Sequence, residues 1–264
     1  MDESPAGHVV AAARPWQMGF QLTGSPILAE MAQFNTMLTI IISMIVLLVL
    51  VLLVFVLLRF NAKRHPTPSR RTHNTSLEFI WTFIPILILA VIAVPSLPLL
   101  YHITRIPKAD MTIKITGHQW YWSYQYPDNG DFSFDAYIVD DKDLKPGELR
   151  LLETDNHVVL PTNTVIRLQI TGGDVIHSWM VPSLGVQMYA VPGRLNEAWV
   201  RIDRAGLYYG QCNQICGVNH GFMPIEIEAM SKTAFTTWAA EAKKEFAGVD
   251  APEISVKLAA AHAD

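Results

Sequence analysis

The chain has 264 residues, enough for one large domain or two modest ones, and its 20 Lys and Arg against 24 Asp and Glu give a net charge of −4. Half of the residues are hydrophobic and only 17% are charged, which excludes an intrinsically disordered chain and a nucleic-acid-binding protein. Two cysteines are too few for a disulfide framework.

Two apolar runs predict a helical hairpin in a membrane. Residues 31–58 contain no charged side chain, and as a helix these 28 residues reach about 42 Å, more than the ~30 Å hydrocarbon core of a bilayer. A second uncharged run covers residues 79–100 and contains three prolines, which membrane helices tolerate where neighbouring helices satisfy the freed carbonyls. We therefore assign residues 31–100 to a transmembrane hairpin.

The charges that flank the two runs predict the topology. The connecting loop, about 59–77, carries five basic residues and no acidic one, whereas residues 1–30 carry three acidic residues and one arginine. By the positive-inside rule this loop faces the cytoplasm or the matrix. The N-terminal segment 1–30 and everything after residue 100 are then external.

The external part of the chain has a different character. Residues 101–264 carry 20 acidic and 14 basic residues, a net charge of −6. Segments 111–116, 165–171 and 197–202 alternate apolar and polar residues, which predicts β-strands. We expect residues 101–230 to form an all-β Greek-key sandwich or barrel. Residues 231–264 should add a helix, with Phe235, Trp238, Ala239 and Ala242 on one side, and a tail.

One short loop holds both cysteines. Cys212, Cys216, His220 and Met223 follow one another at spacings of four, four and three residues. Thiolate, thioether and imidazole ligands suit copper, whereas methionine is not a ligand of structural zinc sites. A Cys212–Cys216 disulfide is the plainer alternative, since an external compartment permits it.

A second histidine outside the loop, His177, would complete a mononuclear blue-copper site with Cys216, His220 and Met223, as in a cupredoxin. Cys212 is then left over. A surplus thiolate favours two coppers bridged by both sulfurs, each completed by one histidine and one weaker ligand. Such a site suits electron transfer, because protein ligands fill it and leave no position for a substrate.

Four segments carry a specific resemblance that covers nearly the whole chain. After the two-span hairpin come GHQWYWSY at 117–124, DVIHSW at 174–179, VPGRLN at 191–196 and LYYGQCNQICGVNHGFMP at 207–224. The chain resembles subunit II of heme-copper cytochrome c oxidases of the alphaproteobacterial or mitochondrial kind. The resemblance implies a cupredoxin-like domain with a dinuclear copper centre, CuA. Its ligands would be His177, Cys212, the backbone carbonyl of Gln214, Cys216, His220 and Met223.

The resemblance also implies an electron-transfer subunit of an enzyme whose oxygen chemistry lies elsewhere. Electrons from cytochrome c would enter at Trp120, reach CuA and pass to heme a in the catalytic subunit I, which reduces oxygen to water and pumps protons. Alternation places Trp120, Trp122, Tyr124 and Tyr126 on one face of a strand, and the alternative for these rings is a place in the core. Hemes would lie only in the partner subunit, and further oxidase subunits would complete the complex. The complex would lie in a bacterial inner membrane with the CuA domain in the periplasm, or in a mitochondrial inner membrane.

Two positions raise questions within this resemblance. Glu78, at the start of the second span, would face a proton-channel entrance in the catalytic subunit, and the alternative is an interfacial anchor. The family usually reads Cys-Ser-Glu-x-Cys, and its glutamate also binds magnesium at the subunit interface, but here the pair is Asn213-Gln214. Because Gln214 lacks the charge that a hard cation prefers, we expect a weakened magnesium site.

Acidic residues predict a docking surface for a basic cytochrome c, because complementary charge raises encounter rates. Between residues 128 and 155 there are nine acidic and three basic residues, and the alternative is an ordinary solvated surface. The residues that we expect to contribute are Asp128, Asp131, Asp135, Asp155 and Asp174.

Other functions remain open for the chain as a whole. It could be a copper-free structural subunit, as in the quinol-oxidising relatives, a membrane-anchored blue-copper carrier, or a copper chaperone. The presence of all five side-chain ligands disfavours the copper-free subunit. Metal binding by Cys212 separates a dinuclear site from a mononuclear one.

Overall fold

The computed structural model describes residues 9–67 and 69–247, and the chain divides into two compact units. One unit is Glu30–Tyr101. The other joins the N-terminal residues up to Ala29 to the chain from His102 onward.

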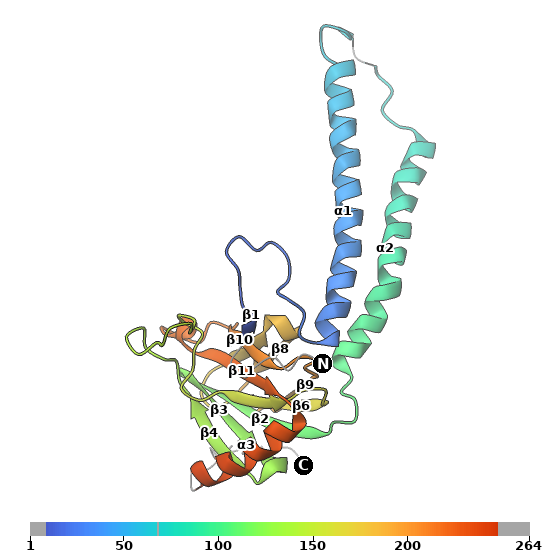
Figure 1. Cartoon of the computed structure of the whole chain (residues 1–264). Helices are drawn as coiled ribbons and strands as arrows, with labels where there is room; N and C mark the ends of the chain where they lie inside the picture. The colour runs from blue at the N-terminus through green and yellow to red at the C-terminus, as the bar shows by residue number, and fades with distance from the viewer. Residues whose placement is uncertain (1–8, 68, 248–264) are drawn as a thin grey trace, which may run out of the picture. The chain divides into compact units, whose positions relative to one another are not determined.

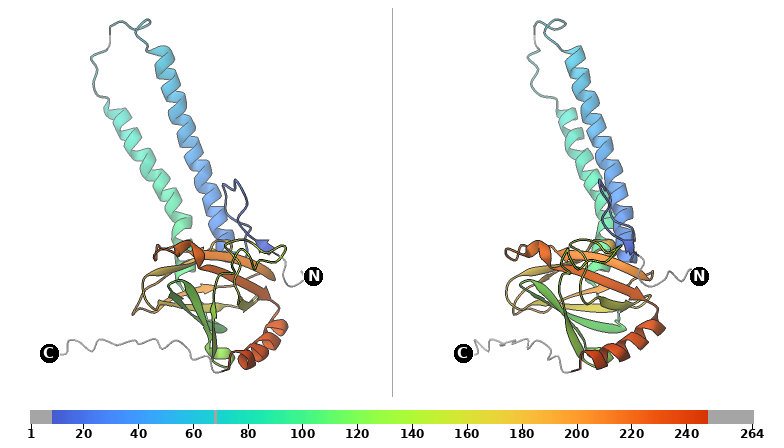
Figure 2. Two further views of the ribbon diagram at one scale, coloured as in Figure 1. Left: turned by 90° about the vertical axis from the view of Figure 1, so that its left-hand side faces the viewer. Right: turned by 60° about the vertical axis from the view of Figure 1, so that its left-hand side comes forward.

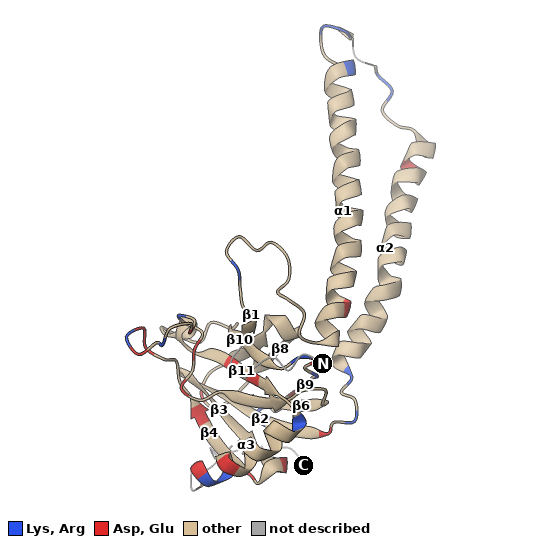
Figure 3. Ribbon diagram, viewed as in Figure 1, with Lys and Arg blue, Asp and Glu red and all other residues tan. Residues whose placement is uncertain are grey.

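Two long helices form the first unit, α1 (Pro26–Arg59) and α2 (Thr75–Thr104) (Figure 1). Both are long and apolar enough to cross a membrane, and their most apolar windows, with mean hydropathies of 3.7 and 2.6, have no buried residue. Figure 3 shows almost no charged residue between the helix ends. Apolar helical segments that bury nothing within the chain need lipid or partner helices around them. The two predicted apolar runs lie inside these helices.

The helix starts have local causes. The hydroxyl oxygen of Ser25 accepts a hydrogen bond from the Leu28 amide at 3.1 Å, so α1 begins at Pro26, five residues before the uncharged run. α2 begins after Asn74, whose side chain accepts from the Leu77 amide at 3.2 Å, and it continues unbroken through its three internal prolines.

The second unit is a sandwich of two β-sheets (Figure 2). One sheet has the order β4-β3-β2-β6-β9, and the other has the order β5-β11-β10-β7-β8 with β1 paired to β10. The strands of the first sheet are β2 (Met111–His118), β3 (Tyr121–Tyr126), β4 (Phe132–Ala136), β6 (Ile166–Gly172) and β9 (Asn196–Val200). Those of the second are β1 (Val9–Ala11), β5 (Val158–Pro161), β7 (His177–Val181), β8 (Val186–Ala190), β10 (Gly206–Cys212) and β11 (Pro224–Met230).

Alternating residues of these strands fill the space between the sheets. Ile113 and Ile115 on β2 and Ile166, Leu168 and Ile170 on β6 are completely buried. A strand places every second side chain on one face, so this alternation turns one face of the sheet into core. The three segments that alternation predicted as strands are confirmed as β2, β6 and β9.

Helix α3 (Lys232–Glu245) closes one end of the sandwich. Its first turn is capped by Ser231, which accepts a hydrogen bond from the Ala234 amide. Phe235, Ala239 and Ala242 are buried, and the Trp238 ring packs against the rings of β3 and β4. The predicted β domain with a C-terminal helix is confirmed, and the predicted tail from residue 248 lies outside the described residues.

Candidate metal centre

Three strand ends bring the predicted copper ligands together. His177 opens β7, Cys212 closes β10, and Met223 stands immediately before β11. β10 pairs with both neighbours, β7 and β11, so these three strand ends lie side by side at one end of the second sheet. Cys216 and His220 lie in the loop between β10 and β11, with His220 at the start of a short 3-10 turn.

The donor atoms lie within a few ångströms of one another. The Cys212 and Cys216 Sγ atoms are 3.9 Å apart. Cys216 Sγ lies 3.6 Å from both His220 Nδ1 and Met223 Sδ. Cys212 Sγ lies 4.0 Å from His177 Nδ1 and 3.3 Å from the carbonyl oxygen of Gln214. The structure therefore brings together all six predicted ligands.

The cysteines are free thiols, so the disulfide alternative is wrong for this structure. Their sulfurs are separated by 3.9 Å, almost twice the length of an S–S bond, roughly 2.05 Å. Two thiols, a thioether and two imidazoles form a soft donor set that fits copper. His177, both cysteines and Met223 are buried, so water has little access to the centre.

The two thiols differ in acidity. Burial alone would raise the pKa of Cys212, but hydrogen bonds from His177 and from backbone groups outweigh it and lower the pKa to about 7. Burial and the negative charge of Cys212 raise the pKa of Cys216 to about 12. Metal binding requires both thiolates, so a bound cation must displace the proton that Cys216 holds.

Asp174 fixes the orientation of His177. Its Oδ1 lies 2.8 Å from His177 Nε2, and the opposite ring nitrogen, Nδ1, faces Cys212. The same carboxylate accepts hydrogen bonds from the backbone amides of Val175 and Gln119, both at 2.6 Å. A carboxylate on the outer nitrogen sets the tautomer and ring angle of a metal-binding histidine. The sequence placed Asp174 only in the docking surface, although its i−3 spacing from His177 was a usable signal.

Two further residues support the centre from the first sheet. The Trp122 indole donates a hydrogen bond to the Met223 carbonyl at 3.2 Å, and its ring meets the His177 ring edge-on. A Cβ at Gly117 would lie 2.9 Å from the His177 ring, so only glycine fits there. Sequence reasoning assigned Trp122 to the core, which is confirmed, but alternation alone could not reveal its hydrogen bond to the ligand loop.

Trp120 lies beside the cysteine loop. A Cβ at Gly217 would come within 2.9 Å of the Trp120 ring, and the Gln119 side chain donates to the Cys216 carbonyl at 2.7 Å. Alternation placed Trp120 on a strand face with Trp122, Tyr124 and Tyr126. That is wrong for Trp120, because the β2–β3 turn occupies residues 119 and 120.

The five predicted docking acids do not gather in one place. Asp128 accepts from the Thr112 amide and Asp131 from the Gln125 side chain, in the turn that follows β3. This turn is at the opposite end of β3 from Trp120, about 20 Å along a six-residue strand. The other three acids, Asp135, Asp155 and Asp174, lie toward the Trp120 end.

Glu78 and Gln214 are the two predicted site residues that remain to be placed. Glu78 accepts a hydrogen bond from the Asn74 amide at 3.0 Å, which makes it the reciprocal partner in the cap of α2. Gln214 is half-buried. In the described part of the chain, the only group of three or more His, Cys, Asp or Glu spaced to hold a metal is His177 with the two cysteines.

Comparisons with known proteins agree over almost the whole described chain. Residues 111–230 match the family described as cytochrome c oxidase subunit II, periplasmic domain, and residues 13–99 match its transmembrane domain. A probable cytochrome c oxidase subunit 2 of Rickettsia bellii is 53% identical over 87% of this chain and 86% of its own length. The cytochrome c oxidase subunit 2 of Phytophthora megasperma is 46% identical over 86% of this chain and 87% of its own length.

A solved structure supports the same assignment for the β domain. The crystal structure of the periplasmic domain of subunit II of cytochrome oxidase from Bradyrhizobium japonicum is 52% identical, with a TM-score of 0.51. It covers 54% of this chain and is itself covered completely. The β sandwich is thus the cupredoxin-like domain of subunit II, and the helical hairpin is its membrane part. The chain belongs to the cytochrome c oxidase subunit II family, as a membrane-protein subunit of an oxidase.

Proposed function

We propose that this chain accepts electrons from cytochrome c at a dinuclear CuA centre and passes them to heme a in the catalytic subunit. That subunit would reduce oxygen to water and pump protons. The observation that carries the proposal is the convergence of six donor atoms at one edge of the second sheet. When bound, a copper pair supplies reversible one-electron chemistry.

The protein's part is to hold the ligands still while the electron count changes. Asp174 and Gly117 restrict the His177 ring, and Trp122 ties down the Met223 backbone. Ligands that are fixed by packing need little rearrangement between two redox states, and a buried site excludes water. These features support electron transfer over a role as copper chaperone, which must release its metal.

Electron entry at Trp120 is supported by the contact of its ring with Gly217, one residue from Cys216. The docking surface is proposed to include the segment 137–156, which we call the acidic loop and which contains Asp155. Asp135 and Asp174 would complete this surface. Six acidic and three basic residues lie in this loop, and each basic residue pairs with an acid inside it. The loop therefore keeps an excess of negative charge for a basic cytochrome c.

The membrane arrangement follows from charge. The basic loop 59–77 is proposed to face the cytoplasm or matrix, with the CuA domain on the periplasmic or intermembrane side of an inner membrane. We propose domain boundaries that divide the chain into the segments 1–30, 31–100, 101–230 and 231–264. Proton delivery near Glu78 and a weakened magnesium site at Gln214 are parts of the same proposal.

Stopped-flow reduction of the copper-loaded full chain by reduced cytochrome c tests the electron route. Trp120→Phe should slow reduction at least about tenfold, since the ring beside Gly217 of the cysteine loop becomes smaller and loses its indole edge. Copper content should remain unchanged. Trp16→Phe is the matched control, because Trp16 is 97% exposed and lies outside the copper site. Equal rates for both variants and the parent chain would contradict entry at Trp120.

A further inference from the structure

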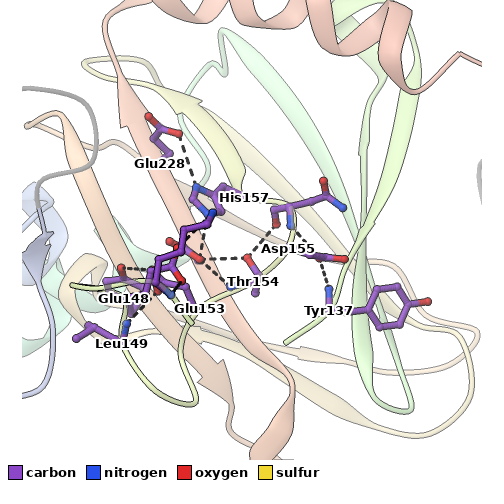
Figure 4. Close-up of polar contacts among 12 residues, drawn as sticks. Tyr137, Glu148, Leu149, Glu153, Thr154, Asp155, His157 and Glu228 are labelled. Atoms are coloured by element: carbon purple, nitrogen blue, oxygen red, sulfur yellow. Dashed lines mark hydrogen bonds and ion pairs between the residues drawn. The ribbon is translucent and has the colours of Figure 1, made fainter. Parts of the chain in front are cut away.

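Four ionisable side chains form a second polar cluster away from the copper ligands. Glu226 and Glu228 lie on β11, His157 precedes β5, and Glu153 is near the end of the acidic loop. Figure 4 shows the contacts that join this cluster to the loop. His157 Nε2 lies 3.3 Å from Glu226 Oε2, and its Nδ1 lies 3.7 Å from Glu228. Glu226 is 1% exposed and Glu153 is 5% exposed.

This cluster attaches the end of the acidic loop to the second sheet. The Thr154 amide donates to Glu226 Oε2 at 2.8 Å, and the Thr154 hydroxyl donates to the same oxygen at 3.3 Å. The Tyr209 hydroxyl on β10 donates to Glu153 Oε1 at 3.4 Å. Glu226 pairs with Tyr209 of β10, and β11 pairs with β5 from Ile227 onward, whereas the only β pairing of residues 137–156 is an isolated bridge, Ile138 with Thr154. If the contacts weaken, the loop is the part that can move.

The charges in the cluster do not balance without a proton. Three carboxylates, Glu153, Glu226 and Glu228, face one imidazole and the Tyr209 hydroxyl, while nearby Glu148 pairs with Lys145. Oε1 of Glu226 is buried and has no hydrogen-bond partner. A buried carboxylate with one oxygen left without a partner is costly, and protonation of that oxygen removes the charge.

The pKa values of Glu226 and His157 are both raised in this cluster. Burial, with a further contribution from Glu153, raises the pKa of Glu226 to about 7 in spite of His157. Burial alone would lower the pKa of His157, but the carboxylates of Glu228 and Glu226 outweigh it and raise that pKa. The pair therefore gains stability from its protons at low pH and loses it as the pH rises through about 7.

We propose that Glu153, His157, Glu226 and Glu228 form a proton-dependent latch on the acidic loop. With a proton on the His157–Glu226 pair, the latch holds Glu153 against β10, where the Tyr209 hydroxyl donates to it. Without it, repulsion between the buried carboxylates of Glu153 and Glu226 drives Glu153 toward water, and the loop opens around Thr154, which still donates to Glu226. The latch itself does not depend on copper; only its consequence, pH-dependent docking of cytochrome c on the external side, rests on the proposed function.

Hydrogen exchange on the copper-loaded full chain, followed by mass spectrometry, tests the latch. Exchange of peptides from 137–156 is divided by that of the β6 peptide at each pH, which removes the chemical pH dependence. This ratio should rise at least about fivefold between about pH 6 and about pH 8. A ratio that stays constant in the parent chain would overturn the proposal without any variant.

Glu226→Gln removes the charge and keeps the size of the side chain. Its loop should stay protected at both pH values, whereas Glu197→Gln, a surface change on β9, should keep the parent response. A Glu226→Gln chain with the full pH response would overturn the role of this residue. Because exchange reports neither copper nor cytochrome c, a failed latch and a failed electron-transfer role give separate signatures.

Discussion

The copper site and the carboxylate cluster are built on the same pair of strands, β10 and β11, and they solve opposite problems. Cys212 ends β10 and Met223 precedes β11, so the ligands project from strand ends into a loop. Tyr209 and Glu226 are direct partners in the middle of the same ladder. At the strand ends, sulfur and nitrogen donor atoms converge on one point, where they can bind a metal cation. In the middle, carboxylates converge on one imidazole and need a proton.

Burial of charge has different consequences depending on which cation neutralises it. Two thiolates and a thioether attract a soft metal that stays bound, so the ligands are tied to fixed elements. Carboxylates attract a proton that exchanges rapidly with solvent, so the segment attached to them can switch. The same sheet can thus carry the proposed electron-transfer site and the proposed pH-sensitive contact a few residues apart.

The largest effect is expected from Cys212→Ser. Without the second bridging sulfur, bound copper should fall from two per chain to at most one, and any remaining signal should be localised on one nucleus. Copper analysis with electron paramagnetic resonance on the full-length variant measures both. Ser178→Ala, a buried change in the neighbouring strand, serves as a control for general loss of packing. Full retention of two coppers would show that Cys212 is not a copper ligand.

Asp174→Asn should weaken copper binding by about 10- to 100-fold, because the amide carries no charge to hold the His177 ring. Competition with a copper chelator measures the change. Asp140→Asn, in the acidic loop, changes charge equally and should leave the affinity alone. If both variants bound copper like the parent chain, Asp174 would have no positioning role.

Glu226→Gln should alter the pH dependence of stability. The pKa of Glu226 is raised from 4.5 to about 7, so its stabilising contribution is complete below 4.5 and disappears as the pH rises through 7. The parent β domain should lose about 2 kcal/mol between about pH 5 and about pH 8 from this group, and the variant should not. Thermal unfolding followed by tryptophan fluorescence checks this. Parallel curves for the two chains would contradict it.

The smallest effect concerns docking. Asp135 and Asp131 both accept side-chain hydrogen bonds but lie toward opposite ends of β3. Asp135→Asn should slow reduction by cytochrome c about twofold at low salt, while Asp131→Asn should not. The parent rate should fall as salt is raised. A rate that is indifferent to salt would remove the docking surface altogether.

Much of this fold could be predicted because its signals are local. Uncharged runs marked α1 and α2, alternation marked β2, β6 and β9, and spacing marked the cysteine loop. The hairpin turn at Trp120 was not predicted, because alternating aromatic residues continue through it. Glu226 and His157 are 69 residues apart in the sequence, so nothing local could reveal their contact. Asp174 was assigned by charge, whereas its carboxylate contacts the ring nitrogen of a histidine three residues away.

The most direct test of the central claim is the copper stoichiometry and electron paramagnetic resonance spectrum of the full chain reconstituted with copper. The full chain is preferred because β1, from the N-terminal segment, pairs with β10, which carries Cys212. We expect two coppers per chain and one unpaired electron shared over two copper nuclei. One copper per chain with a signal localised on a single nucleus would contradict the dinuclear centre and favour a blue-copper carrier.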